Sequence, residues 1–329
     1  MLLRVKLFVL MVLCVPLLAS AADADISAVE TKEQSSAGPF KSFTQTFKSN
    51  GGYLDLGMRF GYIYGQNSYD MNHHVSELEF PFRTYMGGGK INIGYKDLSI
   101  NAEAWSSLFD DPSAGWHTKD KDWDSAGNLE SDTKSYSDMN AIIWDLSMRY
   151  NLLKFSFGKK SSAEECKRSE NIKLGFLMGY RFERFGYKDY GLYQTNGSDS
   201  SYGDGELVSE YKVKYNLPYF GLAMDVGNEK MGVQMNAKYG FKPHAKDYDN
   251  HYLRKLNFYA DYKKKPNVFM ANFVLFYKFL KNWEANLGAD AALIRMDGRT
   301  WENSSSNWDL DQSIDTKQFI YWMGVGYKF

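Results

Sequence analysis

The chain has almost no cysteine, little proline, no large excess of charge and, beyond its leader, no long apolar run. Its 329 residues include 2 cysteines and 7 prolines. Cys14 lies in the leader, so Cys166 would remain alone and could not form an internal disulfide. No later stretch reaches the ~18 consecutive apolar residues of a transmembrane helix. The formal net charge of −1 argues neither for nor against nucleic acid, and we expect no nucleic-acid partner.

The N-terminal segment has the pattern of a secretory signal. Two basic residues precede an apolar run from Leu7 to Leu18, and the small-residue triplet Ala19-Ser20-Ala21 suits cleavage. The apolar run is shorter than the ~20 residues of a membrane anchor. We therefore predict a signal peptide over 1–21, a flexible polar lead-in over 22–50 and a single domain over 51–329.

Aromatic residues are abundant in an otherwise polar chain. They make up 16% of the sequence, although the mean hydropathy is −0.48. With 28 glycines and 7 prolines, this is not the composition of a disordered protein. An exported chain of this kind fits an outer-membrane barrel, whose apolar surface lies in every second residue and is lost on averaging.

Apolar and polar residues alternate with period two along much of the chain, which predicts strands with an apolar face toward lipid. The last stripe, Phe319 to Phe329, is the clearest, and a terminal aromatic residue after such a strand is typical of bacterial outer-membrane barrels. A soluble β-sandwich would also alternate, but it would not bury unpaired charges on the other face. The remaining apolar stripes are Leu54–Tyr62, Leu78–Phe82, Leu98–Ala104, Ile142–Met148, Leu174–Phe182, Met231–Phe241 and Ala285–Leu293.

The pattern predicts an all-β fold, a ten-stranded antiparallel transmembrane β-barrel with long extracellular loops. Outer-membrane barrels have short periplasmic turns and longer external loops, so an even strand count places both termini in the periplasm. The expected strands are 53–64, 76–95, 98–106, 138–151, 171–187, 206–226, 231–243, 254–279, 283–297 and 316–329. The expected long loops are 65–75, 107–137, 188–205, 244–253 and 298–315.

Two of these loops carry closely spaced ionisable residues. Asp120 and Asp122 are two positions apart, so in extended backbone their carboxylates point to the same side. Two like charges so close can share a proton or hold a water molecule. Asp249 and His251 have the same spacing, and a carboxylate beside an imidazole fixes its tautomer and makes it a better base. If the barrel brings the pairs together, they can activate water for attack on an amide carbonyl.

Each pair also has a simpler interpretation. External loops are rich in Asp, Asn and Ser for solvation, so Asp-x-Asp or Asp-x-His alone is a weak signal. The same side chains could bind a divalent cation, although no His-x-x-x-His or Cys-x-x-Cys spacing supports that. A serine nucleophile would lack the Gly-x-Ser-x-Gly motif. We expect no metal.

Around both pairs the sequence resembles the omptins, ten-stranded outer-membrane endopeptidases of double-membrane bacteria. Asp120-Lys121-Asp122-Trp123 is similar to the family's Asp-x-Asp-Trp, and Asp249-Asn250-His251-Tyr252 is similar to its Asp-x-His-Tyr. The resemblance runs from about Tyr53 to Phe329. Further similar segments are 132–138, 179–184, 211–214 and 217–219.

The resemblance implies catalytic roles. His251 would be the base, Asp249 would orient it, and Asp120 with Asp122 would position the water. Asp247 falls where the family has an acid in its substrate-binding pocket.

One family feature has no counterpart. Omptins use a second specificity acid in the first external hairpin, and none stands near Ile63 and Tyr64. The family's preference for basic residues at the cut is therefore an open question for this chain.

The resemblance also implies lipopolysaccharide as a partner, because omptins bind its phosphates with basic residues on the outer wall. Tyr180, Arg184 and Lys214 fall at matching positions. Arg184 shares the parity of Tyr180 and Phe182, so we expect it to project outward, as a phosphate ligand must. An arginine that only reaches toward the membrane interface is an equal alternative. Lys214 is opposite in parity to its aromatic neighbours.

The leading hypothesis is a monomeric outer-membrane endopeptidase that faces the extracellular side and acts on external polypeptides. It needs no cofactor, with lipopolysaccharide as a candidate requirement for activity. The main alternative is an omptin-like adhesin or surface receptor without proteolysis. A solute channel is a third possibility, but charged side chains would fill a ten-stranded lumen.

Overall fold

The computed structural model describes residues 51–71, 75–108, 117–124, 126–157, 170–196, 202–253, 255–302 and 309–329. The predicted signal peptide, the predicted lead-in and Cys166 lie outside these ranges. Within them, no helix is long and apolar enough to cross a membrane.

The described residues form long strands. Their bounds are β1 Gly52–Met71, β2 Ser76–Tyr95, β3 Leu98–Ser107, β4 His117–Trp123, β5 Leu129–Phe157, β6 Glu170–Asn196, β7 Tyr202–Gly227, β8 Met231–Gly240, β9 His244–His251, β10 Leu256–Lys278, β11 Trp283–Glu302 and β12 Asp309–Lys328.

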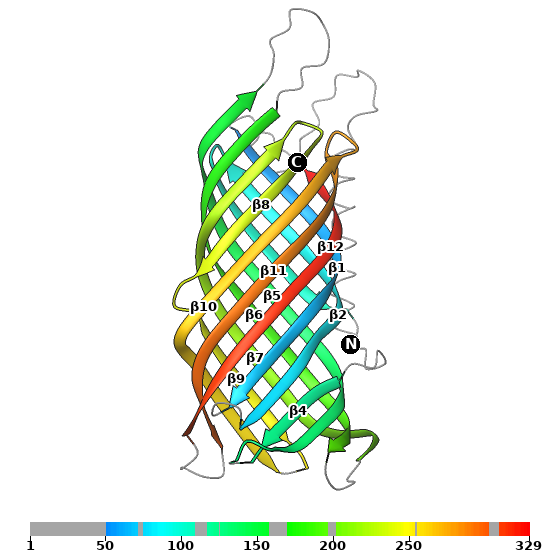
Figure 1. Ribbon diagram of the computed structural model, residues 1–329. Helices are drawn as coiled ribbons and strands as arrows, with labels where there is room; N and C mark the ends of the chain where they lie inside the picture. The colour runs from blue at the N-terminus through cyan, green and yellow to red at the C-terminus, as the bar shows by residue number, and fades with distance from the viewer. Residues whose placement is uncertain are drawn as a thin grey trace, which may run out of the picture.

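These strands close into a single antiparallel barrel (Figure 1). From β1 the order runs through β12, β11, β10, β8, β7, β6, β5, β3 and β2, and β2 pairs back with β1. β4 continues the line of β3 between β2 and β5, and β9 continues the line of β8 between β7 and β10. Twelve segments therefore build a wall ten strands around, which confirms the predicted architecture.

The two ends of the barrel differ. One end carries tight turns, such as Lys96-Asp97 between β2 and β3, and the chain ends there. The opposite end, at the bottom of Figure 1, carries β4 and β9, and we call it the rim.

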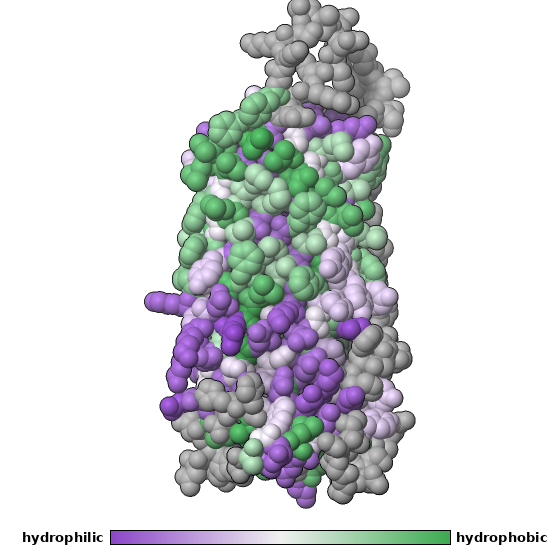
Figure 2. Space-filling view, in the orientation of Figure 1, coloured by the Kyte–Doolittle hydropathy of each residue, from purple (hydrophilic) through white to green (hydrophobic). Residues whose placement is uncertain are grey.

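The outer wall is apolar toward the turn end and polar toward the rim (Figure 2). In the apolar half, outward side chains such as Leu222 and Met323 are 66% and 63% exposed. Toward the rim the outward positions are charged instead, for example Lys212, Lys263 and Arg299. A band of exposed apolar side chains around a closed barrel is the surface that lipid covers. The rim therefore stands beyond that band.

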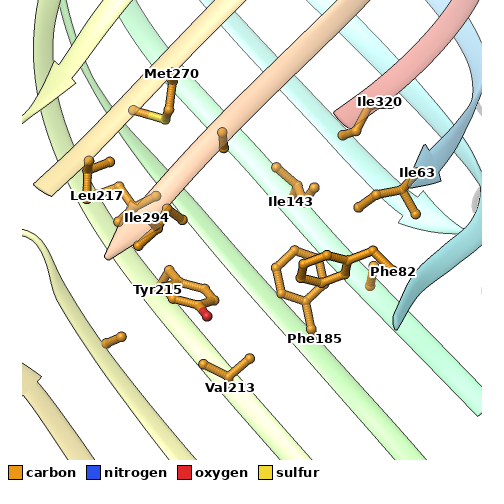
Figure 3. Close-up of a cluster of buried hydrophobic side chains, with 14 of the residues drawn as sticks. Ile63, Phe82, Ile143, Phe185, Val213, Tyr215, Leu217, Met270, Ile294 and Ile320 are labelled. Carbon is orange, nitrogen blue, oxygen red and sulfur yellow. The ribbon is translucent and has the colours of Figure 1, made fainter. Parts of the chain in front are cut away.

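Inside the barrel, a layer of buried apolar side chains crosses the lumen (Figure 3). Phe82 from β2 and Phe185 from β6 meet near its centre, with ring centroids 4.6 Å apart. Most strands of the wall contribute to the layer. Its members include Ile63, Phe82, Ile143, Phe185, Leu217, Met270, Ile294 and Ile320.

Between this layer and the turn end lies a polar cavity of about 170 Å³. Paired charges line it: Arg59 Nη1 lies 2.6 Å from Glu103 Oε1, and Lys238 Nζ lies 2.8 Å from Asp145 Oδ2. Buried charges persist when each has a partner. At these positions the inward charges of the alternating pattern are thus neutralised in pairs.

One expectation about facing is wrong. The stripe Leu78, Phe80 and Phe82 faces the lumen rather than lipid, and these residues are 7%, 1% and 0% exposed. This part of β2 lies toward the rim, where water replaces lipid outside and the aromatic layer fills the interior. Alternation identifies the strand there, but the apolar face is the inner one.

The prediction of loops is also largely wrong, because most of these segments form strands. β1 and β2 extend into 65–75, β6 and β7 into 188–205, and β11 and β12 into 298–315. The two catalytic candidate segments lie on strands β4 and β9. On β4 and β9, with water on the outer side of the wall, polar residues occupy both faces, so the hydrophobic pattern that reveals a strand fades.

Candidate active site

The inward face of β4 carries the first acidic pair. Asp120 and Asp122 have the same parity, and Ser131 Oγ on β5 donates a hydrogen bond to Asp122 Oδ2 at 3.1 Å. Lys119 has the opposite parity and lies 3.3 Å from Glu79 Oε1 of β2. The strand thus directs its carboxylates inward and its lysines to the outer wall.

The inward face of β9 carries the second pair. His251 Nε2 lies 2.9 Å from Asp249 Oδ2, and Asp249 is 8% exposed. The Phe258 ring of β10 stands edge-on to the imidazole, with centroids 5.6 Å apart and an interplanar angle of 86°. The imidazole is therefore held on one side by a carboxylate and on another by an aromatic ring.

The two strands meet at one cleft. Asp120 and His251, more than a hundred positions apart in sequence, both line a rim cavity of about 70 Å³. That volume accommodates a few water molecules. The other lining residues are Leu78, Thr118, Thr133, Ser135, Asp189, Leu192, Val208, Ser209 and Leu253.

Asp247 lies deeper than the dyad on the same face of β9. Its Oδ2 accepts hydrogen bonds from Tyr211 at 3.0 Å and from Tyr262 at 2.6 Å. Burial raises the pKa of Asp247 to about 7, the Tyr262 hydrogen bond opposes this and the charge of Asp249 adds to it. The residue predicted to bind substrate is thus a buried carboxyl beneath the dyad.

A further buried acid, Asp189 of β6, lines the cleft and was not among the sequence candidates. It is 1% exposed and accepts hydrogen bonds from three hydroxyl groups. The signal available was parity, because Asp189 shares the face of Phe185 and Tyr187. That signal depends on knowing that the strand continues through a segment expected to be a loop.

The three predicted lipopolysaccharide ligands lie on the outer wall, away from the cleft. Arg184 on β6 stands directly opposite Lys214 on β7. Tyr180 packs beside Trp144 with centroids 5.4 Å apart, and its hydroxyl donates to Asn216 Oδ1 at 2.5 Å. Lys214 projects outward because its neighbours Val213 and Tyr215 are the inward residues, each 0% exposed.

No metal cluster stands in the described part of the chain: no group of three or more His, Cys, Asp or Glu side chains is arranged there to hold an ion.

Comparison with known proteins shows which family the chain belongs to. The omptin family model matches residues 52–328. The chain belongs to the omptin family. Among curated omptin relatives, a plasminogen activator of Yersinia pestis is 29% identical over 174 residues, covering 50% of this chain and 49% of the relative. Protease 7 of Escherichia coli O157:H7 is 26% identical over 192 residues, covering 54% and 55%.

The omptin fold is also seen among solved structures. The outer membrane protease OmpT from Escherichia coli superposes with a TM-score of 0.70 at 21% identity, covering 84% of this chain and 97% of that one. At this identity the likeness concerns the fold, an outer-membrane β-barrel. The chain's matches span about half the length of the curated relatives.

Proposed function

We propose that this omptin is an endopeptidase that hydrolyses peptide bonds of external polypeptides with an activated water molecule. One observation carries the proposal: Asp120 of β4 and His251 of β9 line a single cleft, and His251 is hydrogen-bonded to Asp249. The family membership and the protease names of its relatives support the same activity.

In this mechanism the imidazole of His251 acts as general base. Asp249 holds Nε2 at 2.9 Å, which fixes the tautomer and leaves Nδ1 as the nitrogen that takes a proton from water. The resulting hydroxide adds to the scissile carbonyl carbon, and the C–N bond breaks as the imidazolium returns the proton to the leaving amine. Asp120 and Asp122 orient the water and stabilise the positive charge that develops on His251.

Two aspartates, Asp120 and Asp189, line the cleft, which favours substrates with basic residues at the cut. Asp247 lies beneath the dyad and would contribute to that preference when ionised. Omptins use two specificity acids, and Asp247 is the one that this chain has at a matching position. The first hairpin has no glutamate near Ile63 and Tyr64, where the second would be expected. A family preference for basic residues is thus expected in weakened form.

The rim faces the extracellular side in this proposal. It stands beyond the apolar band, and the opposite end carries the short turns that outer-membrane barrels place in the periplasm. Lipopolysaccharide phosphates would then meet the outward pair Arg184 and Lys214, with Tyr180 nearer the membrane. The protein would act as a monomer without a metal.

The test uses two histidines of one strand. His251→Ala and Asp120→Ala should lower peptide cleavage by the purified, refolded barrel at least about 10³-fold, as loss of a base does. His244→Ala is the matched control, because His244 also pairs with an aspartate but on the outer wall, with Nε2 2.7 Å from Asp261 Oδ1. Heat-modifiable migration on gels checks that each variant forms the barrel.

The outcomes separate the alternatives. Full activity in either cleft variant would disprove the hydrolytic assignment. The adhesin hypothesis predicts a different result. The wild-type protein would cut no peptide from a broad library in the presence of lipopolysaccharide, with or without chelator, but it would still bind host protein at its rim. Loss of cutting on chelation would instead implicate a divalent cation.

A further inference from the structure

Asp189 is the centre of a hydroxyl cluster that lines the rim cleft. Thr118 Oγ1 donates to its Oδ1 at 2.8 Å, Ser137 Oγ donates to the same oxygen at 2.5 Å, and Ser209 Oγ donates to Oδ2 at 2.6 Å. The donors come from β4, β5 and β7, while Asp189 itself stands on β6. One carboxyl thus collects side chains from three other strands.

Two of these donors stand next to the proposed catalytic groups. Thr118 precedes Asp120 by two positions on the inward face of β4, so both side chains leave the strand on the same side. Ser209 on β7 lies directly opposite His251 on β9. The chain of hydrogen bonds Thr118–Asp189–Ser209 therefore connects the strand of the aspartate pair with the strand that supports the histidine.

β4 is a short strand held in the wall by backbone pairing with β2 and β5. It spans only 7 residues and is separated from the end of β3 by residues 108–116. Backbone pairing sets the position of the strand, and inward side-chain hydrogen bonds, such as the one from Ser131 to Asp122, then orient the side chains that it carries. The Asp189 cluster provides such contacts on the face that carries Asp120.

We propose that Asp189 is a positioning residue for the proposed hydrolysis: its carboxylate sets the separation of Asp120 from His251 and places a further negative charge beside the imidazole. The proposal rests on the proposed function. Asp189 itself does not touch the scissile bond in this account, because three hydroxyl groups already occupy its oxygens.

The titratable groups around Asp189 come from several strands. Asp120 faces it from β4, Tyr187 from β6 itself, and Asp249 and His251 from β9, while β5 and β7 present the hydroxyl groups of Ser137 and Ser209. Burial raises the pKa of Asp189 to about 6, and the three hydroxyl donors act against that rise. The carboxyl is therefore ionised at neutral pH, where a negative charge favours the imidazolium form of His251.

Two substitutions separate positioning from charge. Asp189→Asn keeps the shape and can still hydrogen-bond all three hydroxyl groups, but it removes the charge. Asp189→Ala removes both. Asp261→Asn, on the outer wall of β10, is the matched control for loss of an aspartate charge at the rim.

We expect Asp189→Ala to lower kcat at least about 10-fold with KM changed less than about 3-fold. Asp189→Asn should restore kcat to within about 3-fold of the wild type. In both variants the acid limb of the kcat/KM profile should move to lower pH by about 0.5 to 1 unit, because the imidazole loses a proton more easily without the neighbouring charge.

A purely structural cluster would not move the acid limb. The proposal fails if Asp189→Asn leaves the limb at the wild-type pH, or if Asp189→Ala has wild-type kcat. An NMR titration of the His251 imidazole, in the wild type and in Asp189→Asn, measures the shift of its titration midpoint without relying on catalysis. If the wild type cuts no peptide but the His251 midpoint still falls in the Asn variant, the proposed function fails while the electrostatic link stands.

Discussion

His251 and His244 stand on opposite faces of the same strand, and each is paired with an aspartate. His251 faces the lumen, with Nε2 2.9 Å from Asp249 Oδ2, and His244 faces outward, with Nε2 2.7 Å from Asp261 Oδ1. The local chemistry of the two pairs is nearly the same. Only His251 lines a cleft that Asp120 of β4 also lines, so position in the barrel, and not the pair itself, distinguishes a candidate catalytic group.

This contrast leads to a paired prediction. Asp249→Asn should reduce kcat at least about 10²-fold, because the amide no longer holds the imidazole in the tautomer that accepts a proton from water. Asp261→Asn should leave kcat within about 2-fold of the wild type. Steady-state cleavage of a fluorogenic peptide by both refolded variants makes the comparison, and equal activities would show that the inward pair does not orient the base.

The sequence was sufficient to predict the barrel because half of the wall contacts lipid. There every second side chain must be apolar, as in the stripe that contains Met323, and period two is visible in the sequence. The strand count and the antiparallel order follow from those stripes and from the short turns between them.

The rim could not be predicted in the same way. Its wall has water outside, so β9 reads as a polar loop, and the apolar stripe around Phe80 belongs to the inner face. The spacing of Asp249 and His251 still indicated a shared side, since period two holds for any strand. The cluster at Asp189 depends on contacts among four strands that no local pattern encodes.

The buried carboxyl of Asp247 makes a prediction about stability and pH. Its pKa is about 7 in the folded protein, against ~3.9 in an unfolded chain. Between these values the folded state holds a proton that the unfolded state has released, so stability falls as pH rises through this window. From pH 5 to pH 8 this amounts to about 2 to 3 kcal/mol.

Asp247→Asn should remove the contribution of this carboxyl and leave that of Asp189, whose pKa of about 6 acts in the same direction. Denaturant unfolding followed by tryptophan fluorescence at pH 5 and pH 8 measures the difference, and the variant should show a flatter profile than the wild type. Asp124→Asn is the control, because Asp124 is an exposed turn residue whose pKa is lowered by hydrogen bonds from Asn128. A wild-type profile that is flat over this range would contradict the buried, protonated carboxyl.

The outward pair of Arg184 and Lys214 predicts binding of lipopolysaccharide through its phosphates. The two cations lie directly opposite each other on adjacent strands, a spacing that suits one phosphate group between them. Arg184→Gln with Lys214→Gln should weaken lipopolysaccharide binding at least about 10-fold at low salt. The control is Lys263→Gln, a lysine that pairs with Asp261 on the outer wall of β10. Calorimetric titration with detergent-solubilised lipopolysaccharide would show equal affinities if the pair is only interfacial.

The apolar layer across the lumen predicts that the barrel does not conduct ions. Phe82 and Phe185 are each 0% exposed and close the middle of the lumen between the polar cavity and the rim cleft. The wild type should therefore show no single-channel events in planar bilayers.

Replacing both rings by alanine opens a void at the layer and should cost about 3 to 5 kcal/mol per residue in unfolding free energy. The same variant should then admit water and conduct small ions, whereas Phe60→Ala, on the lipid side of β1 at 42% exposure, should not. Steady conductance in the wild type would mean that the layer does not close the lumen, and the channel interpretation would have to be restored.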